Sequence, residues 1–163
     1  MSDTPANMNH YVDRFFSHNR WERLYRSDFI RTLALYMSAK NYEHDDEIVV
    51  QGEHPQKVIF VVEGHIVVRK RTSDNIYTNV AITPPGRTLC EQSFFDRETA
   101  SAFCHARGDV IVLEMSRKQY EKLSEDHPTI ALILNEYLAS IISQRLRNLL
   151  GKLSEMSEYF GIR

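Results

Sequence analysis

The stretch "LCEQSFFDRETASAF", residues 89–103, brings together side chains that could take part in binding or thiol chemistry. It contains a cysteine, a glutamate, a pair of phenylalanines and a run of small residues, and no amphipathic period runs through it. A Pro-Pro-Gly turn precedes it and an apolar strand follows it. What this stretch binds, if anything, depends on the elements that surround it.

Metal-dependent catalysis is the first alternative, since some β-barrel enzymes of the cupin type hold a metal with closely spaced histidines and a carboxylate. The seven histidines are His10, His18, His44, His54, His65, His105 and His127. They form no His-X-His pair, and His54 and His65, on either side of one strand, have no evident third partner. No local Ser/His/Asp signature occurs either. We therefore predict no catalytic residue, no metal site and no enzyme activity.

The composition is that of an ordinary single globular domain. The chain has 163 residues, of which 42% are hydrophobic and 26% charged, and its net charge is -2. That charge gives no argument for nucleic-acid binding. No apolar run approaches the roughly 18 residues needed to cross a membrane, and the first residues do not resemble a secretory signal. Two cysteines are too few for a disulfide framework. A cytoplasmic protein without a membrane partner is expected.

The sequence around the loop divides into helical and strand regions. Residues 1–10 are polar and predict a mobile N-terminus, and residues 11–40 predict one or two helices that break near Ser27 and Asp28. Trp21 and the pair Phe15 and Phe16 are expected to be core anchors. Residues 41–115 contain short apolar runs separated by turn signals, which is typical of a sandwich or barrel. Two of these runs are predicted to join at a hairpin or tight bend at Glu63-Gly64, and two more at a turn at residues 107–109.

Residues 116–163 predict two helices. Ser116 is the expected N-cap of the first, with Gln119 as its capping-box partner. Pro128 suits the first turn of the second, which should run from about Thr129 to Met156. An a/d heptad seam runs along this long helix through Ala139, Ile142, Leu146, Leu149, Leu153 and Met156. A regular seam of this length favours a homodimer over packing on the helix's own domain.

The order and spacing of three segments, residues 48–53, 59–64 and 86–91, resemble those of the cyclic nucleotide-binding domain family, which includes the sensor half of the catabolite activator protein. The resemblance covers roughly residues 33–150. It implies an α+β, mainly β fold, in which an eight-stranded β-roll of jelly-roll type is flanked by N-terminal helices and a long C-terminal helix.

The resemblance also gives the opening stretch an identity, because residues 86–103 fall where the family carries its phosphate-binding cassette. In that cassette a glutamate accepts hydrogen bonds from the ribose 2′-OH, and an arginine pairs with the cyclic phosphate. Here Glu91 stands at the glutamate position, Cys90 replaces a glycine, and Thr99 stands where the arginine belongs. The loop is about two residues short. The ligand-binding residues that the resemblance implies are Gly86, Cys90, Glu91, Gln92, Ser93, Arg97, Thr99, Ala100 and Ser101.

The function expected from this reasoning is that of a non-catalytic, dimeric regulatory module that acts through contacts with an unidentified protein, with weak or altered binding of cAMP or cGMP and no other cofactor. The alternative is a true cAMP or cGMP receptor whose ligand switches the C-terminal helix. About ten residues follow Leu153, too few for the helix-turn-helix of the family's transcription factors, so no nucleic-acid contact is expected in this chain. Redox sensing through Cys90 and Cys104 competes with a simple packing role for both thiols, which we favour.

Overall fold

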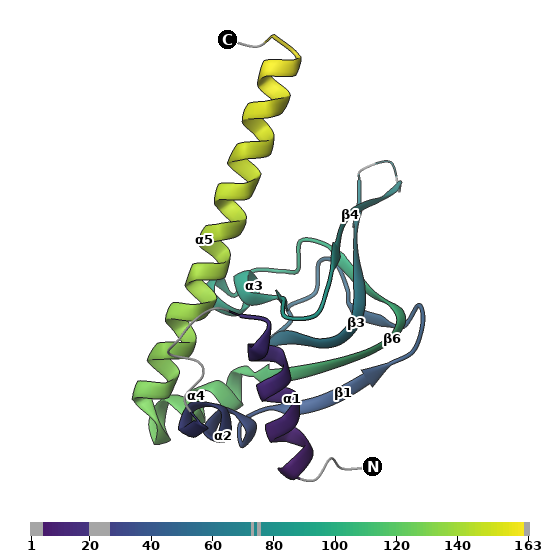
Figure 1. Ribbon diagram of the computed structural model, residues 1–163. Coiled ribbons are helices and arrows are strands. Elements are labelled where there is room, and N and C mark those ends of the chain that lie inside the picture. Colours follow the sequence, from purple (N-terminus) through teal and green to yellow (C-terminus); the bar gives the residue numbers. More distant parts are fainter. Residues whose placement is uncertain (1–4, 20–26, 73, 75, 162–163) are drawn as a thin grey trace.

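The computed structural model of the protein describes residues 5–19, 27–72, 74 and 76–161, so Trp21 lies outside the described residues (Figure 1). The helices are α1 (Pro5–Ser17), α2 (Ser27–Ala34), α3 (Glu91–Asp96), α4 (Arg117–Asp126) and α5 (Pro128–Tyr159). The strands are β1 (Ser38–Tyr42), β2 (Glu47–Val49), β3 (Lys57–Arg71), β4 (Tyr77–Thr83), β5 (Thr88–Leu89) and β6 (Phe103–Ser116).

All strand pairs are antiparallel. The sheet has the order β1-β6-β3-β4, with β2 also paired to β6 and β5 also paired to β3. Helices flank it at both ends of the chain, as Figure 1 shows. The α+β, mainly β class is therefore confirmed. The described residues form six strands instead of the eight expected.

The lower strand count arises at two glycines that bend strands without reversing them. Residues 57–71 form one strand, and so do residues 103–116. Of the two alternatives at Glu63-Gly64, the structure has the bend and not the hairpin, and the turn predicted at residues 107–109 was wrong. Gly64 has φ 76° and Gly108 has φ 75°, and the β3–β6 register shifts on both sides of Glu63. A Cβ at Gly64 would collide with the carbonyl oxygen of Asp109. These are bulges, which let a long strand curl over the core.

Helix α1 begins at Pro5, earlier than the predicted boundary at residue 11, and it anchors the core. Phe15 and Phe16 are fully buried, in agreement with the prediction. The ring of Phe15 packs edge-on against Phe60 of β3, with the centroids 5.1 Å apart, and the ring of Phe16 lies 5.4 Å from that of Tyr137 of α5. Because α1 touches both, it fixes the base of α5 against the sheet.

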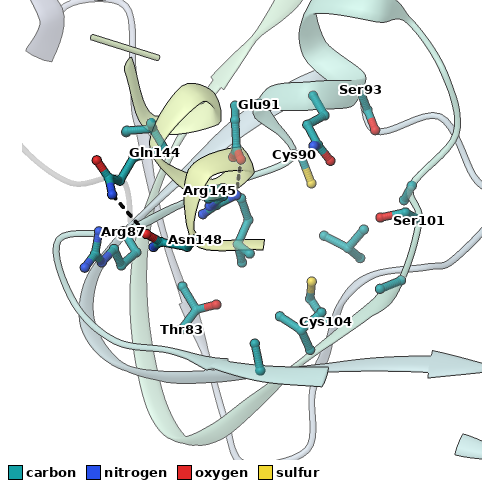
Figure 2. Close-up of a pocket in the computed structure, with 18 of the residues that line it drawn as sticks. Thr83, Arg87, Cys90, Glu91, Ser93, Ser101, Cys104, Gln144, Arg145 and Asn148 are labelled. Carbon is teal, nitrogen blue, oxygen red and sulfur yellow. Dashed lines mark hydrogen bonds and ion pairs between the residues drawn. The ribbon is translucent and has the colours of Figure 1, made fainter. Parts of the chain in front are cut away.

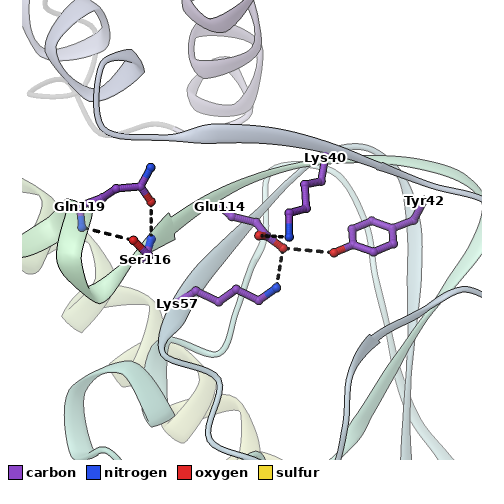
Figure 3. Close-up of polar contacts among 6 residues, drawn as sticks. All are labelled: Lys40, Tyr42, Lys57, Glu114, Ser116 and Gln119. Atoms are coloured by element: carbon purple, nitrogen blue, oxygen red, sulfur yellow. Dashed lines mark hydrogen bonds and ion pairs between the residues drawn. The ribbon is translucent and has the colours of Figure 1, made fainter. Parts of the chain in front are cut away.

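The two C-terminal helices begin where the sequence predicts. The Ser116 hydroxyl accepts a hydrogen bond from the backbone N–H of Gln119, and the Gln119 side chain accepts one from the N–H of Ser116, which completes the capping box (Figure 3). Pro128 starts α5. The buried residues of α5 all lie between residues 131 and 138, and the C-terminal half of the helix extends beyond the rest of the molecule (Figure 1).

One carboxylate is buried in the sheet next to α4. Glu114 is 5% exposed and accepts hydrogen bonds from Lys57 at 2.6 Å and from the Tyr42 hydroxyl at 3.2 Å, and Lys40 lies 2.9 Å away (Figure 3). Burial favours the protonated acid, but the hydrogen bonds and charges of Lys57 and Lys40 outweigh it. They hold the pKa of Glu114 below its usual value.

We expect Glu114→Gln to lower the free energy of unfolding by about 2 kcal/mol at neutral pH, because it removes charge-assisted hydrogen bonds and leaves Lys57 without its counter-ion. A depressed carboxyl pKa contributes stability above the unfolded-state value of about 4.3 and loses it as the pH falls through the folded-state value. The stability difference between wild type and variant should therefore shrink below about pH 4. Urea unfolding at several pH values measures it, and a difference that is constant with pH would contradict the role of the charge.

Candidate ligand-binding pocket

A pocket of about 780 Å³ lies between the curled sheet, α3 and α5. The sheet contributes apolar side chains from β2, β3 and β6, the segment around α3 forms one wall, and the middle of α5 forms the other. Figure 2 shows the labelled side chains pointing into this space from all three sides. A concave site that is lined by apolar groups with a few polar ones is the usual form of a small-molecule site.

The structure brings six of the nine predicted ligand-binding residues to this pocket. They are Cys90, Glu91, Gln92, Ser93, Ala100 and Ser101. Gly86, Arg97 and Thr99 do not line it. Thr99 is exposed, and Ala100 is the first residue of the small-residue run to line the pocket. The wall formed by residues 90–102 thus carries no arginine into the pocket.

The backbone conformation on either side of α3 explains where the side chains of Cys90 and Arg97 lie. Cys90 precedes α3 with φ 64° and Arg97 follows it with φ 63°, both in the left-handed region that glycine adopts most readily. Arg97 turns away to line a separate hollow of about 210 Å³, where its carbonyl oxygen lies 3.1 Å from Nδ1 of His54. A loop pinned in this way does not deliver Arg97 to the main pocket.

Glu91 is the central polar group of the pocket, and α5 reaches it. Its side chain is 1% exposed, and Oε1 accepts a hydrogen bond from the guanidinium of Arg145 (Figure 2). Arg145 also donates to the carbonyl oxygen of Thr88 at 2.5 Å, and the Thr88 hydroxyl donates to Oε2 of Glu91 at 3.2 Å. Both carboxylate oxygens are therefore engaged by the protein. Charge-assisted bonds of this kind are the stronger class of hydrogen bond.

The receptor alternative places the long C-terminal helix over the pocket, but sequence reasoning did not name the residues that α5 contributes to its wall. Its lining residues are Tyr137, Ser140, Ile141, Gln144, Arg145, Arg147 and Asn148. In the heptad pattern Arg145 directly precedes the seam residue Leu146, where a charged residue is ordinary and predicts nothing about a pocket. Arg87, from the turn before β5, lines the pocket as well. The only sequence signal for Arg87 is its position directly after Gly86, and this position does not by itself predict a side chain in the pocket.

The two cysteines both line the pocket, and neither has the character of a reactive thiol. Burial, with the neighbouring thiol and Glu91 as smaller causes, raises the pKa of Cys90 to about 12. Burial raises the pKa of Cys104 to about 12 as well, again with Glu91 adding to it. Both side chains are therefore protonated at neutral pH, which favours packing over redox sensing because the thiolate is the reactive form.

Two other structural findings bear on the function classes considered above. Within the described residues, no three His, Cys, Asp or Glu side chains are grouped closely enough to hold a metal ion. In the same part of the chain, no helix is long and apolar enough to cross a membrane.

The family model described as "Cyclic nucleotide-binding domain" matches residues 39–127, more than half of the chain. The chain belongs to this family. The match begins in β1 and ends just before α5, so it includes all of the sheet except Ser38, and the Glu91 wall of the pocket. Comparison with curated protein sequences gives no match.

Solved structures of the family share the fold. A cyclic nucleotide-binding domain from Methylobacillus flagellatus superposes with a TM-score of 0.84 at 16% identity, over 96% of this chain and 87% of that one. The catabolite activator protein of Thermus thermophilus gives 0.70 at 23% identity, over 88% and 63%. The regulatory subunit of a cAMP-independent protein kinase A from Trypanosoma cruzi, bound to guanosine, gives 0.64 at 19% identity, over 91% and 52%. The chain thus spans about half to two thirds of the last two proteins.

Proposed function

We propose that this chain is a non-catalytic regulatory module that acts through protein contacts made by α5, and that it binds cyclic nucleotides weakly. The observation that carries the proposal is the ion pair between Glu91 and Arg145 in a pocket whose α3 wall has no arginine. The carboxylate that would receive a ribose hydroxyl is already occupied, and the cation that would receive the phosphate is absent from its usual place.

A ribose hydroxyl can bind Glu91 only after the carboxylate of Glu91 loses its present hydrogen-bond partners. Arg145 and Thr88 together satisfy both oxygens of a side chain that is 1% exposed. Breaking such an arrangement leaves a buried charge for the ligand to satisfy, which costs several kcal/mol before any gain. Loss of the phosphate-pairing arginine costs roughly 1.5–3 kcal/mol more, or about one to two decades of affinity.

The same ion pair links the pocket to α5, the helix that we propose makes the protein contacts. Arg145 lies on α5 directly before Leu146, so a ligand that displaces Arg145 from Glu91 removes a contact between this helix and the pocket. A ligand shifts a conformational equilibrium only as far as it binds the two states differently. Breaking the ion pair supplies that difference, which supports a regulatory role for α5.

The surface that would make the protein contacts is the seam of α5. Leu146, Leu149, Leu153 and Met156 are each between 52% and 56% exposed, and Ala139 and Ile142 continue the stripe toward the body of the molecule. An apolar stripe of this regularity at a/d positions fits a second copy of the same helix in a parallel or antiparallel coiled coil. We therefore propose a homodimer, and a protein partner that reads its arrangement.

Solved structures with this fold differ in the ligand that they hold. The solved Trypanosoma cruzi regulatory subunit belongs to a cAMP-independent kinase and holds guanosine, whereas the regulatory domain of Toxoplasma gondii protein kinase A was solved with cAMP. The fold is thus compatible with a change of ligand. For this chain we propose such a change, driven by its own pocket residues.

Calorimetric titration of the wild-type protein with cAMP and cGMP tests the proposal. We expect no micromolar binding, because Glu91 is engaged and no arginine faces the pocket from the α3 side. The matched variant Glu91→Gln should likewise show no micromolar binding. Micromolar binding that is lost in Glu91→Gln would contradict the proposal and favour the alternative, a true receptor whose ligand switches α5.

A further inference from the structure

The charges that line the pocket are distributed unevenly between its two walls. Three arginines contribute to the lining, Arg87 from the turn before β5 and Arg145 and Arg147 from α5. Among the described lining residues Glu91 is the only carboxylate, and Arg145 neutralises it. The pocket therefore has an excess of positive charge, although the whole chain carries a net charge of -2.

The positive charge lies on the side away from the family's phosphate site. The α3 wall presents Cys90, Ser93 and Ser101, which carry no charge at neutral pH. In Figure 2, Arg87, Arg145 and Asn148 are drawn on the opposite side of the pocket from Ser93 and Ser101. An anion that enters this pocket is attracted toward α5, because charges act more strongly in a partly enclosed site than in open water.

The arginines on α5 retain donors for an anion. Arg147 uses two of its nitrogens within the helix, donating to the Ser143 hydroxyl at 2.8 Å and to the Gln144 side chain at 3.3 Å. A guanidinium has five N–H donors, so several remain for a ligand. Arg145 is 40% exposed at its side chain despite its bonds to Glu91 and Thr88, and it faces the same space. Guanidinium groups match the geometry of phosphate oxygens.

We infer that the phosphate of a nucleotide bound in this pocket is held by Arg145 and Arg147 of α5, with Arg87 facing it, and not by the loop of residues 90–102. The helix takes over the charge that the loop of residues 90–102 lacks. The inference rests on the proposed function, since it locates the phosphate contacts in the same pocket. When the ligand binds, its hydroxyl groups replace Arg145 at Glu91 and its phosphate receives the freed guanidinium, so one ion pair is exchanged for two ligand contacts.

Charge selectivity separates this arrangement from the binding of an uncharged nucleoside. The quantity to measure is the ratio of the Kd for adenosine to the Kd for cAMP, obtained by calorimetry on the full-length protein up to 10 mM ligand. We expect cAMP to bind at least tenfold more tightly than adenosine. Arg145→Gln and Arg147→Gln should each lower this ratio at least fivefold. Arg145→Gln should also strengthen adenosine binding, because it releases Glu91, a change that general loss of structure would not produce.

Lys152→Gln is the matched control, because it removes one positive charge from α5 outside the pocket lining and should leave the ratio unchanged. A wild-type ratio near one would overturn the inference and identify a nucleoside pocket. A ratio that falls in Ser101→Ala but not in the α5 variants would overturn it in favour of the α3 wall. Absence of cAMP binding at 10 mM would also overturn it, yet would leave the proposed regulatory function standing. Micromolar cAMP binding that is lost in Ser101→Ala and kept in the α5 variants would contradict both this inference and the proposed function.

Discussion

Replacing Leu149 and Leu153 with glutamate should convert the protein from a dimer to a monomer. Both leucines are more than half exposed on α5, at consecutive d and a positions of the seam. Burying a leucine side chain contributes about 1.5–3 kcal/mol, so the four leucines of a dimer contribute about 6 kcal/mol or more. Their loss alone raises the dissociation constant by about four decades, and four added negative charges repel one another across the seam.

Sedimentation equilibrium at protein concentrations from micromolar to hundreds of micromolar measures this effect. The double variant Ser154→Glu/Lys152→Gln is the matched control, because it also changes the charge of each chain by -2, at exposed residues next to Leu153 but off the seam. We expect the control to remain dimeric. The seam residues lie beyond the buried part of α5, so circular dichroism should show both variants folded. A wild-type protein that is monomeric throughout this range, or a double variant that stays dimeric, would contradict the proposed dimer.

Placing an arginine at residue 100 should strengthen cAMP binding by about 10- to 100-fold, the effect of one charge-assisted hydrogen bond of roughly 1.5–3 kcal/mol. Ala100 lines the pocket, and its backbone is held by hydrogen bonds with Gly52 and Glu53 at 2.9 and 2.7 Å. A side chain at this position therefore begins from a fixed point on the α3 wall. Calorimetric titration of Ala100→Arg against wild type gives the change in affinity directly.

Thr99→Arg is the matched control for this variant, because it adds the same charge one residue away at an exposed position outside the pocket. We expect it to leave cAMP affinity within threefold of wild type. Ala100 is 6% exposed and packs in the core beneath the pocket, so thermal unfolding should be measured as well. If Ala100→Arg unfolds, Ser101→Arg tests the same wall from an exposed residue. Enhancement by Thr99→Arg alone would show that the loop rearranges to bring residue 99 into the pocket.

The seam and the pocket lining lie on different faces of α5. The seam residues Leu149 and Leu153 are exposed and do not line the pocket, whereas Gln144 and Asn148 do. Arg145 stands between these faces, bonded to Glu91 on one side and adjacent to Leu146 on the other. A change in dimer affinity on ligand binding would therefore be transmitted through this residue, and Arg145→Gln should remove it.

The sequence by itself determined the features that depend on local periodicity and local hydrogen bonding. The capping box of Ser116 and Gln119, the start of α5 at Pro128 and the exposed heptad stripe are encoded within one or two helical turns, and the structure has each of them. The order of apolar runs and turns also sufficed for the mainly β class and the family. A local pattern predicts its own element because its cause lies within a few residues.

Tertiary structure alone decided how those elements meet. The sequence predicts a hairpin or tight bend at Gly64 and a turn at Gly108. Pairing between β3 and β6 instead makes both glycines part of bulges in two long strands. Arg145 lies 54 residues from Glu91 in the chain, and only the packing of α5 on the sheet places its guanidinium in the pocket. The left-handed residues around α3 likewise turn Arg97 away. Contacts between distant segments depend on the register and packing of the whole domain, which no short stretch of sequence contains.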